Sequence, residues 1–333
     1  MACEFCSSPS FLALFADRLR FLWAELQLSI LFKDTPDDGV LSALGSLPQT
    51  LERTYERILK DQDAFNPPQK HKTTRKVLLW LVATARPLAL QEVNDAVSEG
   101  VSRRKDLQGI IRLCGPLVRL VSQGASDHQQ VSLAHFSLKE YLTSGKVLDS
   151  PSSEIHKYNV NLSDAHLHIA KVSLSYISSQ ELREVFNHKD DLGVIRDEFK
   201  LLDYAVLYGG THLRPLPEAD DAVIALLNDI FVPGTVSPSP HRQGKLFLEL
   251  LSTLGDSRLR KHPPSIDPLY YASFFGWKLG AKRILELGPK QRETDVLNHA
   301  LRAASLGGFD DVIQLLHQAG ADVNAHPVSY THL

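Results

Sequence analysis

The chain has 333 residues, of which 43% are apolar and 23% are charged, a globular composition that excludes bulk disorder. Lysine and arginine total 36 against 39 acidic residues, so the net charge of -3 indicates neither a basic field for nucleic acid nor an acidic tail. The length predicts about two or three domains. The 3 cysteines are too few for a disulfide framework, and no apolar run reaches the roughly 18 residues of a membrane span. The first ten residues lack the basic start of a secretory signal, so we expect a cytoplasmic protein.

The first predicted element is an amphipathic helix over residues 11–33, where apolar side chains recur at three- and four-residue spacing. Turn-forming residues 35–39 end this helix. A further helix is expected over residues 51–63, and the sequence Asn66-Pro67-Pro68 breaks the chain after it.

Residues 72–144 are expected to form one small α/β unit. Its predicted elements, in chain order, are helix 77–82, an extended entry 86–88, helices 91–98 and 107–113, strands 117–121 and 130–135, and helix 137–143. Thr73 or Thr74 is the expected cap of the first helix. A polar loop with Gly124 separates the strands, which predicts a hairpin. Three helices followed by a hairpin is the winged-helix arrangement.

Residues 151–260 are predicted to be helical with loops. Ser163 or Asp164 is the expected cap of a helix over 165–178, and another helix is predicted to begin at Leu201. Proline and serine residues concentrated in 232–240 indicate a linker or loop.

The last part of the chain repeats itself after 32 residues. The equivalent pairs are Leu269 and Leu301, Ala272 and Ala304, Ser273 and Ser305, Gly276 and Gly308, and Gly288 and Gly320. Small alanines let paired helices pack closely, and Gly288 and Gly320 are expected to supply the left-handed turn after the second helix of each unit. Phe274, Phe275 and Trp277 form either an exposed contact or part of the core, and we favour the core.

A search for catalytic signatures finds no phosphate loop, dinucleotide-binding fingerprint, zinc-protease motif or nucleophile elbow. Cys3-x-x-Cys6 has the spacing of two zinc ligands, but no second pair of ligands accompanies it in the sequence. His166 and His168 are two positions apart and do not face each other on a helix. Most of the 14 histidines are expected to be solvated. We therefore expect no catalytic residues, no metal and no cofactor, and a protein that is not an enzyme.

The second repeat resembles an ankyrin repeat. The match lies in Gly308-Phe309-Asp310-Asp311-Val312-Ile313-Gln314-Leu315-Leu316 and in Ala319-Gly320-Ala321-Asp322-Val323-Asn324-Ala325. The first repeat is similar but departs from the family pattern at Asp267 and Tyr270, where threonine and histidine are preferred. The alternative is an unrelated pair of helical hairpins. The resemblance implies a short ankyrin α-solenoid that binds a protein partner.

The upstream part resembles the region that follows a NACHT nucleotide-binding module in fungal ankyrin-repeat proteins of the NLR-like STAND family. The resemblance lies in residues 20–28, 47–59, 86–88, 113–118, 133–142 and 201–205. Residues 86–142 are similar to the winged helix named after GPI inositol-deacylase, a name that does not imply deacylase chemistry. The expected fold is mainly α, in domains 1–65 (C-terminal NACHT helices), 66–150 (winged helix with a small β-hairpin), 151–262 (helical spacer), 263–327 (about two ankyrin repeats) and 328–333 (an artefact).

The resemblance implies a nucleotide-controlled switch. In such proteins a winged helix packs over ADP, and His135 resembles by position the histidine that touches the phosphate. This role applies to an intact family member, because we expect the chain to begin within the last NACHT helices and to lack the ATPase core. ATP or ADP would then bind only with that core. The function indicated is non-enzymatic regulation and protein interaction.

Two other functions remain as alternatives. Basic runs 70–76 and 103–105 leave nucleic-acid binding by the winged helix as the alternative function, although solvated helix starts explain them more simply. An ATPase would require a phosphate loop from another subunit.

The six final residues, 328–333, match one reading frame of the transposase mosaic-end adapter used in sequencing libraries. We interpret them as a sequencing artefact and expect the ankyrin array to continue in the gene.

Overall fold

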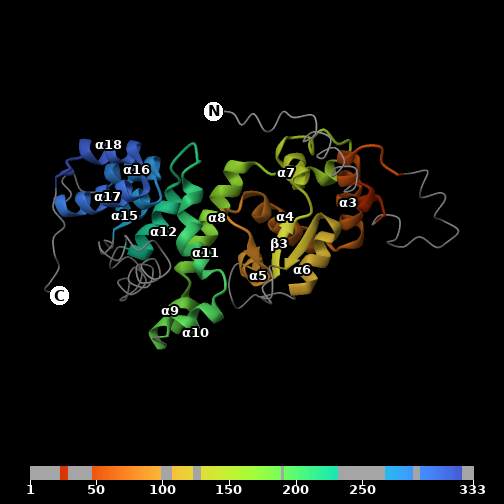
Figure 1. Ribbon diagram of the computed structural model, residues 1–333, viewed down its shortest axis with the longest axis horizontal. Helices are drawn as coiled ribbons and strands as arrows, with labels where there is room; N and C mark the ends of the chain where they lie inside the picture. The colour runs from red at the N-terminus through yellow and green to blue at the C-terminus, as the bar shows by residue number, and fades with distance from the viewer. Residues whose placement is uncertain are drawn as a thin grey trace. The chain divides into compact units, whose positions relative to one another are not determined.

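The computed structural model describes residues 23–28, 47–98, 107–122, 129–188, 191–231, 267–287 and 293–324 (Figure 1). The described residues are mainly helical with a small antiparallel sheet, which confirms the expected mainly α fold class. Of the predicted helix 11–33, residues 23–28 are described and are helical. Residues 328–333 and the basic run 103–105 lie outside the described part of the chain.

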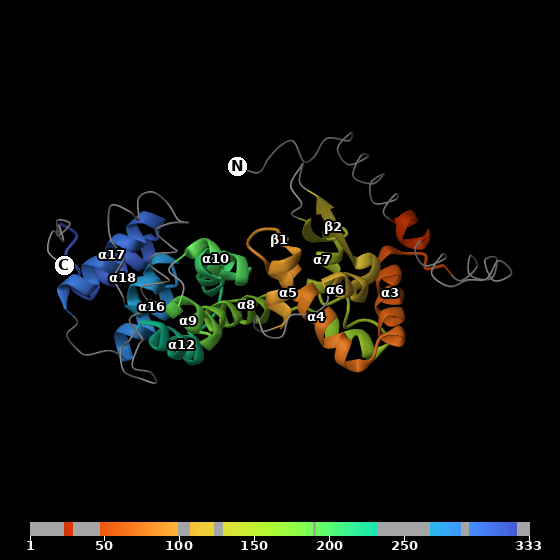
Figure 2. The same ribbon diagram turned by 90° about the horizontal axis from the view of Figure 1, so that it is seen from below.

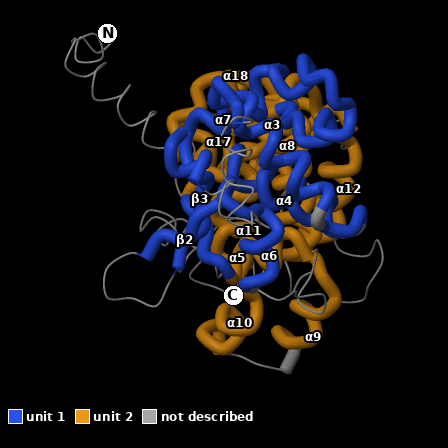
Figure 3. The backbone as a smooth tube through the Cα atoms, turned by 90° about the vertical axis from the view of Figure 1, so that its right-hand side faces the viewer, with its two compact units in different colours: residues 1–82, 87–90, 106–161 blue, residues 83–86, 91–105, 162–333 orange. Residues whose placement is uncertain are grey.

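The chain divides into two compact units, coloured separately in Figure 3. Unit 1 contains residues 1–82, 87–90 and 106–161, and unit 2 contains residues 83–86, 91–105 and 162–333. The chain therefore passes between the units several times. Most of the predicted helix 91–98, which was expected within the winged helix, belongs to unit 2.

Within unit 1 the helices and strands follow the order of a winged helix. Its elements are α3 (Leu51–Phe65), α4 (Pro68–Ala83, whose last residue belongs to unit 2), β1 (Leu88–Ala89), α6 (Leu107–Cys114), η4 (Gly115–Leu117), β2 (Val118–Ser122), β3 (Gln129–Leu133), α7 (Phe136–Thr143) and η5 (Ser153–Tyr158). Helix α5 (Leu90–Ser98) comes between β1 and α6, and its residues 91–98 belong to unit 2.

Helix α3 begins and ends where the sequence chemistry predicts. The hydroxyl of Thr50 accepts the backbone N–H of Arg53 at 3.3 Å, and Asn66 ends the helix in an extended conformation before Pro67. Helix α4, in contrast, begins at Pro68, because proline is favoured at the first position of a helix. The prediction that Thr73 or Thr74 caps this helix is therefore wrong, and both side chains are buried inside it.

The sheet has the strand order β1-β3-β2, with both pairs antiparallel. Val131 of β3 lies opposite Leu88 of β1 and Leu120 of β2, so its side chain is almost fully buried. The predicted hairpin is confirmed by the β2–β3 pairing. The third strand, β1, begins at Leu88, the last residue of the predicted extended entry 86–88.

Unit 2 begins as a set of helices packed around α8 (Leu162–Ile177). Helix α8 contacts α11 (Leu202–Tyr208), η6 (Gly209–Leu213) and α12 (Asp221–Phe231), and α9 (Gln180–His188) contacts α10 (Leu192–Glu198). The predicted caps Ser163 and Asp164 are wrong, because α8 already begins at Leu162. The sequence predicted α8 and the start of α11 but did not resolve α9, α10 and α12.

The rest of unit 2 consists of two helix pairs, α15 (Pro268–Phe274) with α16 (Lys278–Leu287) and α17 (Thr294–Gly307) with α18 (Asp310–Gln318), which lie together in Figures 1 and 2. Equivalent helices contact each other, since α15 packs on α17 and α16 on α18. Helix α12 also contacts α15, so the pairs rest on the preceding helices of the unit.

The two pairs share the same turn. Gly276 and Gly308 both have φ of 68°, a left-handed conformation that glycine adopts without strain. The following residues donate their N–H groups five residues back, Trp277 to the carbonyl of Ala272 at 2.8 Å and Phe309 to that of Ala304 at 3.0 Å. The 32-residue repeat in the sequence is therefore a repeat of backbone geometry.

Two of the three aromatic side chains, Phe275 and Trp277, belong to the core, as expected from the sequence. Phe275 is 2% exposed and Trp277 1%, while Phe274 is half-buried. Glycine makes this packing possible, because a Cβ at Gly210 would lie 2.2 Å from the ring of Phe275. The guanidinium of Arg214 lies 4.4 Å from the ring centre of Phe309 and donates to the carbonyl of Phe275 at 3.2 Å.

No helix in the described ranges combines the length and the apolar character needed to cross a bilayer.

The shared turn predicts that alanine at Gly276 destabilises unit 2 more than alanine at Gly308. Gly308→Ala should destabilise unit 2 by about 1–2 kcal/mol, the cost of a left-handed residue with a Cβ, since no atom lies within 4 Å of that Cβ. Gly276→Ala should cost about 1–3 kcal/mol more, because its Cβ would lie 2.7 Å from the ring of Phe309. Hydrogen exchange of the α15–α18 amides measures both losses, and equal losses would contradict the packing argument.

Candidate functional site

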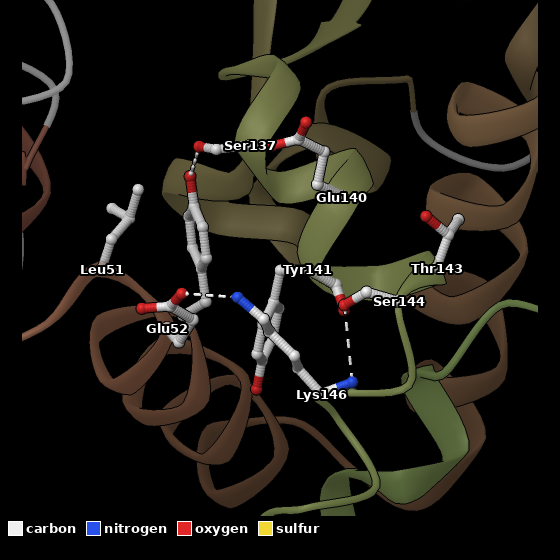
Figure 4. A pocket seen from close by; sticks show the side chains of 9 residues that line it. Leu51, Glu52, Ser137, Glu140, Tyr141, Thr143, Ser144 and Lys146 are labelled. Carbon is white, nitrogen blue, oxygen red and sulfur yellow. Dashed lines mark hydrogen bonds and ion pairs between the residues drawn. The ribbon is translucent and has the colours of Figure 1, made fainter. Parts of the chain in front are cut away.

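A hollow of about 400 Å³ lies in unit 1 between α3 and α7 (Figure 4). Its lining comes from the first turns of α3, from one side of α7 and from the turn that follows α7. The lining residues are Leu51, Glu52, Tyr55, Ser137, Glu140, Tyr141, Thr143, Ser144 and Lys146.

A chain of hydrogen bonds runs from this hollow to His135. The hydroxyl groups of Tyr55 and Ser137 are 2.9 Å apart, and the Ser137 hydroxyl is 2.8 Å from Nδ1 of His135. Nδ1 also accepts the backbone N–H of Ser137 at 3.2 Å, which makes His135 the N-cap of α7. The sequence placed His135 at a strand-to-helix junction, and the structure places it at the start of α7.

The cap determines where the proton of a neutral His135 ring lies. Because Nδ1 accepts from the backbone, the proton is assigned to Nε2. Partial burial lowers the pKa of His135, the nearby Arg119 lowers it further, and Glu140 acts in the opposite direction. The ring is therefore held neutral with Nε2–H as a hydrogen-bond donor.

Ser137 and His135 together have the residue types of a nucleophile and a base, but their geometry is local. The imidazole nitrogen that faces the hydroxyl is already the acceptor for the same residue's backbone N–H. Among the described residues no carboxylate hydrogen-bonds to Nε2, so no third group orients the ring as in a catalytic triad. The pair forms a helix cap.

A second polar cluster lies within unit 2, around His212. Nδ1 of His212 is 2.8 Å from Nδ1 of His166, and its Nε2 is 2.8 Å from the Tyr204 hydroxyl. The Tyr204 oxygen accepts the backbone N–H of Ala85 at 3.0 Å and contacts the Thr84 hydroxyl at 3.1 Å. Through these hydrogen bonds Tyr204 connects residues 84–85 with α11. Sequence reasoning missed this pair, because His166 and His212 are 46 positions apart.

His212 is 2% exposed, an exception to the expectation that most histidines are solvated. Burial lowers the pKa of His212 to about 4, with a further contribution from His166. Among the described residues no group of three potential ligands is close enough to hold a metal ion.

The depressed pKa of His212 predicts acid sensitivity of unit 2. Below the ordinary pKa of 6.5 the unfolded chain binds a proton that the folded chain binds only below about 4, so stability falls as the pH drops from 6.5 to 4. The full loss is roughly 3 kcal/mol. Hydrogen exchange of α8 and η6 across this range measures the loss. His212→Gln should flatten the pH dependence, and an unchanged slope in that variant would contradict the assignment.

The repeat residues named from sequence occupy consistent places. Leu269, Ala272, Leu301 and Ala304 are buried, at 0%, 0%, 6% and 0% exposure. Gly276, Gly308 and Gly320 have positive φ, while Gly288 lies outside the described residues. Asp322 and Asn324 form the turn after α18, where the N–H of Asp322 donates to Asn298 at 2.8 Å and that of Asn324 to Asp322 at 2.9 Å.

The sequence did not identify the residues that line the hollow. Tyr55 lies within the predicted helix 51–63, but nothing in the sequence indicated that its hydroxyl contacts Ser137. Glu52 and Lys146 are 94 positions apart and approach to 3.0 Å only in the folded chain. Of the basic run 70–76, Lys70, Lys72 and Arg75 are exposed on α4, and His71 bonds to the carbonyl of Asn66.

Residues 65–154 match the family model described as "GPI inositol-deacylase, winged helix domain". The chain therefore contains a winged-helix domain of this type. A curated protein, "Azaphilone pigments biosynthesis cluster protein L" of Monascus ruber, is 27% identical over 310 residues. The alignment covers 84% of this chain and 61% of that relative, so the chain spans less than two thirds of the relative's length. No solved structure matches.

Proposed function

We propose that the chain is a non-enzymatic regulatory and protein-interaction part of an NLR-like signalling protein. Its winged helix serves nucleotide-state control and its C-terminal helix pairs are ankyrin repeats that bind a protein partner. The observation that carries the proposal is the repeated turn at Gly276 and Gly308, with the same backbone bonds in both pairs. The family match of the winged helix supports a regulatory role.

The stacking of equivalent helices supports the ankyrin assignment. Ankyrin repeats stack first helix on first helix and second on second, as α15 does on α17 and α16 on α18. Two repeats are fewer than the roughly three needed for independent stability. Here the contact of α12 with α15 supplies the missing neighbour. The departures at Asp267 and Tyr270 are compatible with this fold, because Asp267 caps α15 through Leu269 N–H at 2.7 Å.

Ankyrin binding faces are concave and include the exposed side of the first helices. On α17 the residues Asp295, His299, Arg302 and Leu306 follow one stripe that is exposed or half-buried. On α18 the exposed Asp311, Gln314 and Gln318 follow a comparable stripe on a second helix. The proposal assigns partner binding to the α17 stripe.

Paired variants of the two stripes test the assignment. Asp295→Arg with Leu306→Glu alters the α17 stripe, and Asp311→Arg with Gln318→Glu makes the same charge change on α18. We expect the α17 variant to bind at least about tenfold less partner, which corresponds to a loss of about 1.4 kcal/mol in binding free energy. The α18 control should bind as much partner as the unmodified protein. The measurement is quantitative crosslinking and mass spectrometry of the tagged full-length gene product in its host. Equal partner retention by both variants would overturn the proposal.

The nucleotide role predicts a difference between this chain and the full-length protein. By calorimetry this chain alone should bind neither ATP nor ADP. In the full-length protein with its NACHT core, His135→Gln should weaken ADP retention about tenfold, because Nε2–H donates to a phosphate oxygen. His156→Gln serves as the matched histidine control. ADP binding by the isolated chain, or equal ADP retention by the two variants, would contradict this part of the proposal.

A further inference from the structure

The phenol of Tyr204 holds the segment of unit 2 that lies between α4 and β1. Its oxygen accepts the backbone N–H of Ala85 at 3.0 Å and the hydroxyl of Thr84 at 3.1 Å, and the same hydroxyl is 2.7 Å from the carbonyl of Arg86. Tyr204 is 0% exposed, so its own proton needs an acceptor within the protein. With two donors on the phenol oxygen, that proton is directed at Nε2 of His212, which is 2.8 Å away.

This bond decides the tautomers of two histidines. Because Nε2 of His212 accepts the phenol proton, the proton of the neutral His212 ring is assigned to Nδ1. That Nδ1–H donates to Nδ1 of His166 at 2.8 Å, so the neutral His166 ring carries its proton on Nε2. The line of donors therefore runs from Tyr204 through His212 to His166, and it is complete only while both rings are neutral.

One added proton is incompatible with this arrangement, because an imidazolium donates from both of its nitrogens. A charged His166 would direct its Nδ1–H against the Nδ1–H of His212, and a charged His212 would direct its Nε2–H against the phenol proton. With a proton on either ring, Nε2 of His212 must become a donor to the Tyr204 oxygen. That oxygen then faces three donors with two lone pairs, so it loses contact with residues 84–85.

The surroundings direct the added proton to the outer ring of the pair. His166 is half-buried, whereas His212 is 2% exposed. Burial, together with the charge of His166, lowers the pKa of His212 to about 4. The guanidinium of Arg86 lies 5.2 Å from the ring centre of Tyr204, so a further positive charge stands beside the phenol.

Other charged or titratable groups lie on the elements that pack around the pair. They are Asp164, His168 and Lys171 on α8, Asp203 on α11, Asp221 and Asp229 on α12, and Arg86 in the segment 83–86. Four of them are in ion pairs, which are Lys171 with Asp220 at 2.9 Å, Arg86 with Glu92 at 2.6 Å, Asp203 with Arg196, and Asp221 with Arg283. The residues one helical turn from His166 on α8 carry no charge, and they are Leu162, Ser163, Ile169 and Ala170. Burial and the repulsion between the two rings therefore dominate the response of the pair to pH.

We propose that His166 and His212 form a pH-dependent latch for residues 84–85. While both rings are neutral, the Tyr204 oxygen holds Ala85 and Thr84. When the pair takes up one proton from water, the Nε2–H of His212 displaces these donors and the segment is released. The latch acts on a stretch of unit 2, residues 83–86, that is flanked along the chain by residues of unit 1. It does not rest on the proposed function.

Imidazole ¹⁵N NMR of the histidine-labelled whole chain tests the latch between about pH 8 and about pH 5. We expect His212 to carry its proton on Nδ1 at the higher pH and on Nε2 once His166 is charged. In step with that titration, the protection of the Ala85 amide against hydrogen exchange should fall about tenfold, the effect of losing one hydrogen bond. A proton on Nε2 of His212 throughout, or Ala85 protection that does not follow the titration of His166, rules the latch out.

Paired variants on α8 separate the latch from a general effect of acid. His166→Gln removes the charge of the outer ring, so Ala85 should stay protected down to about pH 5, because the remaining His212 has a pKa of about 4. His168→Gln, two positions further along the same helix, is the matched control and should keep the pH dependence of the unmodified chain. If the two variants respond alike, the proposal fails.

A second pair of variants tests the phenol itself. Tyr204→Phe removes the oxygen that holds the segment, so Ala85 should be about tenfold less protected even at the higher pH. Tyr208→Phe, whose ring also lies beneath Arg86, should leave this protection unchanged. Thermal unfolding shows whether each variant is folded, and if Tyr204→Phe is not, the tautomer of His212 in the unmodified chain decides. Equal Ala85 protection in the two folded variants would show that Tyr204 does not hold the segment.

Discussion

The two helix pairs of unit 2 depend on aromatic rings packed directly against glycine backbone. Phe275 occupies the space that a side chain at Gly210 would fill, and Phe309 does the same at Gly276. Arg214 covers Phe309 and bonds to the carbonyl of Phe275, so a single cation connects the preceding helices to both pairs. This contact joins the preceding helices of the unit to the core of the two pairs.

In unit 1 the contact between α3 and α7 supports the start of α7. Tyr55 is almost fully buried in the core, and its hydroxyl also bonds to Ser137, which supports the cap made by His135. The same two helices line the hollow, to which Tyr141 and Glu140 contribute. The cap and the Tyr55 hydroxyl therefore act together at the start of α7, beside the hollow.

Much of the fold could be predicted from local patterns. The spans of α3, α6 and the β2–β3 hairpin follow from hydrophobic periodicity and turn residues, which act over a few positions. Helix starts were less predictable, because Pro68 begins α4 five residues before the first expected cap. Of the candidate site residues, His135 was identified through a family resemblance. Glu52, Tyr141 and Lys146 were not, since no short-range pattern connects them.

The sequence by itself determined the mainly α class, the winged-helix order and the 32-residue repeat, since periodicity, glycine turns and β-rich runs are local properties. Only the tertiary structure decided which polar groups meet. His166 was considered with His168 two positions away, yet its partner is His212, buried against Tyr204. The hollow likewise combines α3 with a turn 94 positions later, where Lys146 meets Glu52. Such contacts depend on how helices pack, and packing brings together residues whose separation along the chain carries no signal.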